Sequence, residues 1–385
     1  MIKGKFPLEK LKGIETPFYY YDMEVLKKTL KIVKEETKKY GFFQHYAVKA
    51  NANRRILEMI ASEGFGADCV SGNEVKAAIN AGFPASKIVF AGVGKTDKEI
   101  NQALDLNIFC FNVESLPELE VINELATKKG KTAQVAFRIN PNVDAHTHEY
   151  ITTGLSENKF GFSLSILPEA IDKLQTLKNI KLIGIHFHIG SQIEDVDTFI
   201  PLCKKVEELQ LLFEEKGIKL ENINLGGGLG INYEDPNNHP IPQFEEYFEL
   251  FHKNLKVRDG QSVHFELGRS VVAQSGSLVT RTVYVKHGDI KTFVIVDAGM
   301  TDLIRPALYQ AYHKVENISS DLPVQKYDIV GPICESSDVF VKDYDLNETQ
   351  RGDLLVLRSA GAYGEIMASQ YNCRDLPKAY YSDKI

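Results

Sequence analysis

The residues Tyr46-Ala47-Val48-Lys49-Ala50-Asn51 end a short apolar run, and a lysine stands where such a strand would pass into a helix. Unbroken apolar runs are typical of parallel strands covered on both faces, and the stretches between them are long enough for helices. Eight strand–helix units are the number that closes a (β/α)₈ barrel. We therefore expect an α/β fold with this barrel over residues 25–268. The predicted strands are 43–50, 66–71, 88–93, 107–113, 134–140, 182–190, 222–228 and 263–269.

The pattern changes after Arg269. Alternating runs at 278–286 and 292–297, joined by His287-Gly288-Asp289, predict an antiparallel hairpin. Residues 327–333 and 353–359 also have strand character, and a strand over 16–21 precedes a helix that Asp22 would cap. We expect a second, antiparallel β-domain, a sandwich or barrel, formed by residues 1–24 and 269–385.

Composition indicates a folded protein that acts on small molecules. The 385 residues are 43% apolar and 25% charged, and the net charge is −7. Acidic and basic residues are interspersed along the chain, so there is no basic stripe to bind nucleic acid or a membrane. The sequence has no membrane-spanning run or signal peptide, and its five scattered cysteines form no disulfide framework. We expect a cytoplasmic protein with reduced thiols.

Unusual residues cluster where the barrel strands should end, which is where (β/α)₈ enzymes place their chemistry. A lone lysine is usually a solvated charge, but a desolvated lysine can attack a carbonyl as the free amine, so Lys49 is a candidate nucleophile. His186 and His188 would point to the same side of one strand. We predict no metal there, because no third ligand is apparent; His188 could instead stack on a planar ring, with His186 in the core.

Two further strand ends carry candidate binding groups. Gly226-Gly227-Gly228 can expose consecutive N–H groups to a phosphate, although a glycine run alone is as readily a tight turn. The next strand ends in Glu266-Leu267-Gly268-Arg269, an acid and a guanidinium at the same rim. A lysine amine, a ring-stacking histidine, a phosphate cradle and an acid for a ring nitrogen together are what pyridoxal 5′-phosphate (PLP) requires.

Ten motifs in order complete the pattern, and the chain resembles the barrel-type, alanine-racemase-like PLP-dependent decarboxylases. Within that group it is most similar to the diaminopimelate decarboxylases. The resemblance covers nearly the whole chain, which departs from the usual pattern at Leu267 and Ser337, and also at Asn73 and Thr301. The motifs are TPFYYYD, YAVKAN, ADCVSGNE, ENKFG, HFHIGSQI, NLGGGLG, ELGR, DAGMTDLIRPALY, GPICESSD and AGAYG.

The resemblance implies roles around the cofactor. Lys49 would bind PLP covalently, His188 would stack on its ring, and Glu266 would hold the ring nitrogen protonated, which makes the cofactor an electron sink. Phosphate binding and supporting contacts are implied for Asp68, Ser191, Gly226, Gly227, Gly228, Gly268, Arg269 and Tyr363.

The resemblance also implies a substrate and a partner. Cys334 would return a proton to the α-carbon and Glu335 would pair with a distal ammonium, both reaching the partner subunit's site in a homodimer. A distal carboxylate would meet Arg269, Arg305, Tyr309 and Tyr363. Two arginines favour a substrate with a second carboxylate, because a guanidinium fork matches a carboxylate. The implied substrate is meso-2,6-diaminopimelate. Its decarboxylation to L-lysine and CO₂ is the last step of lysine biosynthesis.

Three alternatives stay open at this point. A related decarboxylase would act on ornithine, arginine or carboxynorspermidine, and a catalytically silent binding homologue would regulate a true decarboxylase. Alanine racemase shares the barrel but would pair the ring nitrogen with an arginine, and Glu266 speaks against it. The loop 142–159, with His146 and His148, is long enough to act as a lid.

Overall fold

The computed structural model describes residues 6–143 and 159–385, and the chain divides into two compact units. One unit comprises Leu30–Gly230 and Gln243–Gly268; the other comprises Met1–Thr29, Ile231–Pro242 and Arg269–Ile385. The segment 231–242 lies inside the range expected for the barrel but groups with the second unit. The reason is its hydrogen bonding, because the Gln274 amide donates to the carbonyls of Asn232 and His239.

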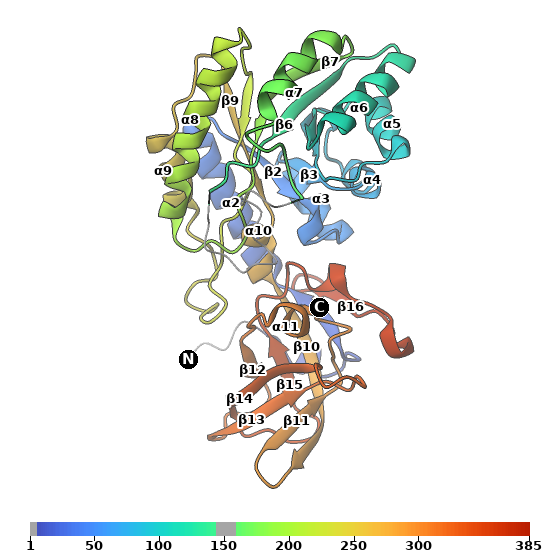
Figure 1. The fold of residues 1–385 in the computed structure, drawn as a ribbon. Helices are drawn as coiled ribbons and strands as arrows, with labels where there is room; N and C mark the ends of the chain where they lie inside the picture. Colours follow the sequence, from blue (N-terminus) through green and yellow to red (C-terminus); the bar gives the residue numbers. More distant parts are fainter. Residues whose placement is uncertain (1–5, 144–158) are drawn as a thin grey trace. The chain divides into compact units, whose positions relative to one another are not determined.

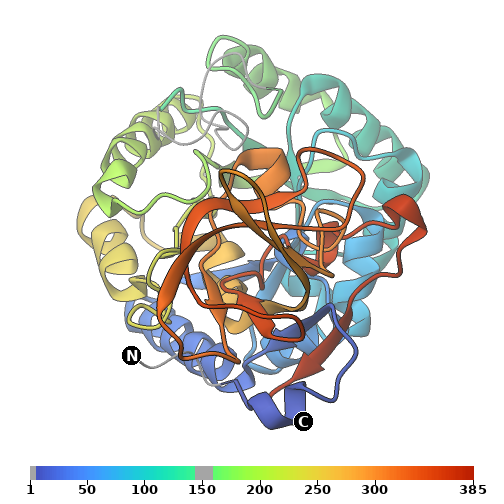
Figure 2. The same ribbon diagram turned by 90° about the horizontal axis from the view of Figure 1, so that it is seen from below.

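The first unit is a closed barrel of eight parallel strands in chain order, and β9 pairs with β2 to complete it. Figure 2 shows the helices of this unit arranged in a ring. The (β/α)₈ prediction is confirmed. The strands are β2 (Phe43–Ala47), β3 (Gly66–Cys69), β4 (Ile88–Phe90), β5 (Cys110–Val113), β6 (Ala133–Arg138), β7 (Ile180–His186), β8 (Asn222–Asn224) and β9 (Ser262–Leu267). The helices are α2 (Met23–Tyr40, which begins in the second unit), α3 (Arg54–Ser62), α4 (Gly72–Asn80), α5 (Asp97–Leu106), α6 (Leu116–Lys128), α7 (Leu167–Lys173), α8 (Ile200–Glu215) and α9 (Phe244–Asn254).

Side-chain caps fix where these helices begin. Asp22 accepts from the N–H groups of Glu24 and Val25 at the start of α2, and Thr96 and Glu99 form a reciprocal capping box on α5. The strands stop two to four residues earlier than expected at most C-terminal ends, because the motif residues there form turns and loops. Lys49, for example, lies in a 3₁₀ turn (Val48–Ala50) after β2.

The second unit is built on an eight-stranded sheet (Figure 1), and the N-terminal strand joins it as expected. β1 pairs antiparallel with β10, and β10 forms the predicted hairpin with β11. The sheet is nevertheless mixed, since β11 pairs parallel with β13 and β1 parallel with β16; a long connection and the two chain ends allow this. The elements are β1 (Phe18–Tyr21), β10 (Gly276–His287), β11 (Thr292–Val296), β12 (Val315–Asn317), β13 (Val324–Val330), β14 (Val339–Asn347), β15 (Leu354–Leu357), β16 (Lys378–Tyr381), α1 (Leu8–Leu11), α10 (Arg269–Val272) and α11 (Arg305–Tyr309).

The interior of the barrel carries a directed chain of buried histidines. The Lys87 carbonyl can only accept, so the His45 Nδ1–H donates to it (3.0 Å), and His45 Nε2 accepts from His264 Nδ1–H (2.8 Å). The Ser262 hydroxyl, 2.8 Å from His264 Nε2, completes the chain. Burial lowers the pKa of both histidines, that of His264 to about 3, so both are neutral at pH 7.

This chain makes the fold sensitive to acid. An unfolded histidine has a pKa of about 6.5. Between about pH 6.5 and 3 the unfolded chain therefore holds a proton that folded His264 does not, and the unfolding free energy falls as pH falls through that window. The variant His264→Asn keeps an amide donor toward His45 without titrating. Its unfolding free energy, measured in denaturant from pH 7 to pH 4, should fall less steeply than the wild-type value, by up to about 1.4 kcal/mol per pH unit.

The exposed His252 of α9 supplies the matched control, and His252→Asn should keep the wild-type pH slope. An unchanged slope in His264→Asn would show that His264 is not kept neutral by burial.

Candidate active site

Lys49 is held at the mouth of the barrel by the packing of its turn. The end of β9 approaches this turn closely, since a Cβ on Gly268 would lie 3.0 Å from the Cβ atoms of Ala47 and Ala50. The Lys49 ammonium is 3.7 Å from the carboxylate of Asp68, the penultimate residue of β3. Glycine at 268 therefore lets the last and first strands place Lys49 beside Asp68.

Burial favours the neutral form of the Asp68 carboxyl group. Its pKa is raised to about 8, by burial first and then by the charge of Glu266, and the attraction of Lys49 opposes the shift only in part. Its Oδ1 atom is buried without a hydrogen-bond partner in the described part of the chain. Asp68 is thus a weak counter-charge for Lys49 and keeps an unused polar atom.

Glu266 on β9 is surrounded by donors from three other strands. Asn112 on β5 and Asn224 on β8 donate to Oε1 at 3.0 and 2.7 Å, and His186 Nε2 on β7 lies 2.7 Å from Oε2. Burial alone would raise the pKa of this carboxyl, but the interaction with His186, supported by His45 and Lys49, lowers it below its usual value. The result is a carboxylate that stays ionised inside the barrel.

His188 follows β7 and is neutral. Its pKa is well below the usual value, through burial first and then through the positive charges of Lys49 and Arg138. A neutral imidazole beside Lys49 suits stacking on a flat ring. In His186, two residues earlier, the Nε2 atom is hydrogen-bonded to Glu266. The other ring nitrogen, Nδ1, has no hydrogen-bond partner among the described residues.

The glycine run after β8 packs against the ends of its neighbours. A Cβ on Gly226 would lie 2.1 Å from the Phe187 carbonyl oxygen, and one on Gly227 would lie 2.3 Å from that of Glu266. Packing thus requires glycine at both positions. The N–H groups of Gly227 and Gly228 have no acceptor in the part of the chain that the structure describes, and Ser191 lies in the preceding β7 loop. These two N–H groups can bind an anion.

The second unit brings together the predicted guanidinium groups. Arg269 and Arg305 are both buried, at 6% exposure each, and both donate to the hydroxyl of Tyr233, at 2.6 and 2.9 Å. The Arg269 guanidinium also lies 5.0 Å from the ring centre of Tyr363, while Tyr309 is half-buried at the end of α11. This cluster is a cationic site for an anion.

Cys334 and Glu335 lie on an exposed loop of the same unit. Glu335 accepts from the Tyr371 hydroxyl (2.8 Å), and the Cys334 N–H donates to the Asn372 side chain (3.3 Å). Asp338 holds the loop by accepting from the N–H groups of Met300 and Ile333. The structure thus places these two residues beside the 371–372 segment. The predicted lid has its residues 144–158 outside the described part of the chain.

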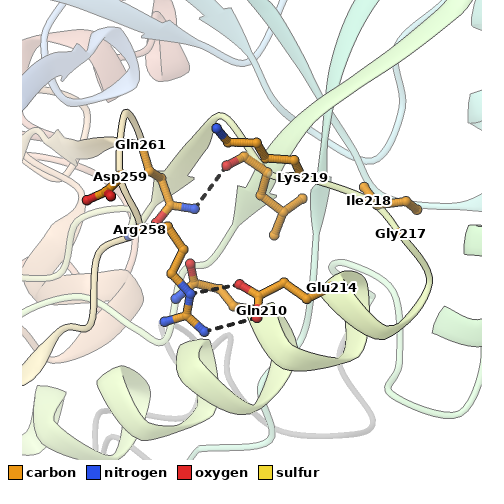
Figure 3. Close-up of a pocket in the computed structure, with 9 residues that line it drawn as sticks. Gln210, Glu214, Gly217, Ile218, Lys219, Arg258, Asp259 and Gln261 are labelled. Carbon is orange, nitrogen blue, oxygen red and sulfur yellow. Dashed lines mark hydrogen bonds and ion pairs between the residues drawn. The ribbon is translucent and has the colours of Figure 1, made fainter.

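Hollows of the barrel unit also lie away from these residues, at the N-terminal ends of the strands. One of about 430 Å³, drawn in Figure 3, lies between the end of α8 and the loops before β8 and β9. Arg258 pairs there with Glu214, and Gln261 donates to the Leu220 carbonyl. These contacts join the end of α8 to the loops before β8 and β9, on the face of such barrels that is opposite to the one where their chemistry takes place.

The described residues contain neither a cluster of metal ligands nor a membrane-spanning helix. Within 6–143 and 159–385, no group of three or more His, Cys, Asp or Glu is arranged to hold a metal. Over the same ranges, none of the helices combines the length and apolarity needed to cross a membrane.

Comparison with known proteins decides the family. The model of the pyridoxal-dependent decarboxylases, for their pyridoxal binding domain, matches residues 24–273. Over the full length of both chains the sequence is 61% identical to a diaminopimelate decarboxylase of Bacteroides thetaiotaomicron. This chain belongs to the diaminopimelate decarboxylase family of pyridoxal-dependent decarboxylases. The predicted family and its cofactor, PLP, are confirmed.

Solved structures agree with this assignment. The chain matches the Helicobacter pylori diaminopimelate decarboxylase complexed with L-lysine at 42% identity and a TM-score of 0.91, covering 98% of this chain and 94% of that one. A lysine/ornithine decarboxylase of Vibrio vulnificus has a TM-score of 0.85 over 98% of this chain and 97% of that one, but only 20% identity, and shows the shared fold alone.

The residues of the barrel mouth fit PLP. Two unpartnered N–H groups, at Gly227 and Gly228, suit its phosphate, and the ionised Glu266 suits a protonated ring nitrogen. Neutral His188 can lie against a cationic ring without repulsion.

Sequence reasoning missed three residues of these clusters. Asn112 and Asn224 orient Glu266, and Tyr233 joins the two arginines. Asn112 did leave a signal, since it is a polar residue in the middle of an apolar strand, and Asn224 directly precedes the glycine run. Tyr233 lies in a loop and has no distinguishing pattern.

Removing the His186 donor should destabilise the protein. In His186→Leu the Oε2 atom of a buried carboxylate loses its partner, and the unfolding free energy at pH 7 should fall by about 3 kcal/mol. His186→Gln, whose amide can still donate, should lose about 1 kcal/mol, roughly one ordinary hydrogen bond. Denaturant titration of both variants measures the difference, and equal losses would contradict the assignment of His186 as the donor to Glu266.

Proposed function

We propose that this chain uses PLP to decarboxylate meso-2,6-diaminopimelate at its D-centre, releasing CO₂ and L-lysine. The observation that carries the choice of substrate is the pair of buried guanidinium groups, Arg269 and Arg305, that converge on one oxygen. A guanidinium fork is the side chain that best matches a carboxylate. Diaminopimelate keeps such a group after losing CO₂, whereas the distal ends of ornithine and arginine carry only positive charge.

The barrel residues divide the cofactor's requirements among them. PLP, when bound, supplies an electron sink for the carbanion that CO₂ loss would leave. In this proposal Lys49 is the covalent attachment point and His188 stacks on the ring. The carboxylate of Glu266, held ionised by its three donors, keeps the ring nitrogen protonated. Asp68 supports the site from β3, beside Lys49.

Phosphate binding is assigned to backbone and side-chain donors. The N–H groups of Gly227 and Gly228 are available, and Gly226 gives the turn that presents them. Ser191, Arg269 and Tyr363 complete the proposed set of phosphate-binding residues. Gly268 is included because the chain packs closely there.

The remaining substrate contacts come from the second unit. Tyr309 and Tyr363 are assigned with the two arginines to the retained carboxylate, and Glu335 to the substrate's distal ammonium. Cys334, an exposed thiol, would deliver the proton to the α-carbon after CO₂ leaves. We infer that Cys334 and Glu335 act in the site of a partner subunit, so that the active enzyme is a homodimer. Its cytoplasmic location and its place as the last step of lysine biosynthesis belong to the same proposal.

Lys49→Ala should abolish turnover. With the amine removed, lysine formation from meso-diaminopimelate should fall by at least about a thousandfold, since covalent catalysis is lost. Borohydride reduction should leave a pyridoxyl group on the wild-type peptide that contains Lys49 and none on the variant. The exposed Lys38 of α2 gives the control, Lys38→Ala, with wild-type rates. Normal turnover by Lys49→Ala would contradict the mechanism.

Arg305→Lys should separate the substrate classes. The change keeps the charge but loses the fork, so kcat/KM for meso-diaminopimelate should fall about a hundredfold. Arg351→Lys, at an exposed arginine of the same unit, should have no effect. If the enzyme instead acts on ornithine or arginine, Arg305→Lys should leave its rate with that substrate nearly unchanged, and the proposed substrate would be wrong.

A further inference from the structure

Tyr233 connects two cations that would otherwise repel each other. Its hydroxyl oxygen accepts from Nη1 of Arg269 at 2.6 Å and from Nη1 of Arg305 at 2.9 Å, which brings two buried guanidinium groups to a single atom. The Arg305 guanidinium also lies 5.1 Å from the centre of the Tyr233 ring. The phenol therefore contacts the arginines through both its oxygen and its ring.

His313 contacts both Arg305 and Tyr233 and holds them in position. Its Nδ1–H donates to the Arg358 carbonyl (2.8 Å), so its Nε2 atom accepts from Arg305 at 2.9 Å. The ring of His313 meets that of Tyr233 edge to face, with centroids 5.2 Å apart at 82°. Burial, and then the charge of Arg305, lowers the pKa of His313 to about 3, so it accepts at every working pH. Arg305 and Tyr233 are thus held in place before any ligand arrives.

The Tyr233 hydroxyl has one bonding capacity left over. A phenol oxygen has two lone pairs and one proton, and the two arginines use both lone pairs. The proton has no acceptor in the described part of the chain, which covers residues 6–143 and 159–385. An anion that approaches the two guanidinium groups would provide that acceptor, and Arg305 has no carboxylate within ion-pair distance among the same residues.

We propose that Tyr233 is a specificity-determining residue, which positions Arg269 and Arg305 as a pair and donates its hydroxyl proton to the carboxylate that the substrate keeps. Three donors then converge on one carboxylate. A ligand that lacks this group gains nothing from Tyr233 and must meet two cations. This inference deepens the proposed function and rests on it.

The test compares two ligands that differ only in that carboxylate, L-lysine and cadaverine. Calorimetry on the PLP-loaded enzyme would measure their dissociation constants in the wild type and in Tyr233→Phe, which keeps the ring contacts with Arg305 and His313. Loss of the hydroxyl should weaken L-lysine about tenfold or more, the size of a hydrogen bond to a charged group. Cadaverine should change by less than about twofold.

Equal weakening of both ligands would assign Tyr233 a merely structural role, and no change in either would remove it from the site; each result overturns the proposal. Tyr284→Phe, at an exposed tyrosine of the same unit, controls for loss of a phenol elsewhere and should bind both ligands as the wild type does. The proposed function is tested separately by the wild type, which should form CO₂ from meso-diaminopimelate. Failure of that reaction would refute the substrate and not the role of Tyr233 in carboxylate binding.

Discussion

The barrel unit depends on keeping one carboxylate ionised in its interior. An isolated buried carboxylate would take up a proton, because burial disfavours the charged form. Glu266 escapes this through donors on β5, β7 and β8, so four strands must hold their register for the charge to persist. His264, two residues earlier on β9, continues the polar interior toward the N-terminal end through His45. Two hydrogen-bonded polar groups, one around Glu266 and one around His264, therefore lie in the interior of a barrel type whose interior is usually filled by branched apolar side chains.

Close packing of the strand ends explains the glycines around the barrel mouth. Glycines at 226 and 227 are required because a Cβ at either position would overlap a carbonyl oxygen of the neighbouring strand, and a Cβ at Gly268 would be tightly packed, 3.0 Å from two alanine Cβ atoms. That close approach also brings Lys49, Asp68 and His188 within electrostatic reach of Glu266. Packing and chemistry thus make the same demand at these positions. A substitution there would affect stability and cofactor binding together.

Much of the fold could be predicted from the chain, because apolar runs and capping residues are local signals. The eight barrel strands, the helix cap by Asp22 and the place of the N-terminal strand in the second sheet are confirmed. Hydrogen bonds across the barrel are not local. Asn112 and Glu266 are 154 residues apart, and no sequence spacing could connect them. The mixed pairing of the second sheet and the grouping of residues 231–242 with it were missed for the same reason.

The two units divide the work in the proposed enzyme. The barrel supplies a lysine, a neutral ring stacker and a permanent anion, which suit the cofactor, whereas the arginines of the other unit suit a second carboxylate on the substrate. The central claim is therefore a claim about substrate class. It is tested most directly by CO₂ release from a panel of meso-diaminopimelate, L-ornithine, L-arginine and carboxynorspermidine. The account predicts CO₂ and an equal amount of L-lysine from meso-diaminopimelate alone, and it would be contradicted by comparable release from any of the other three.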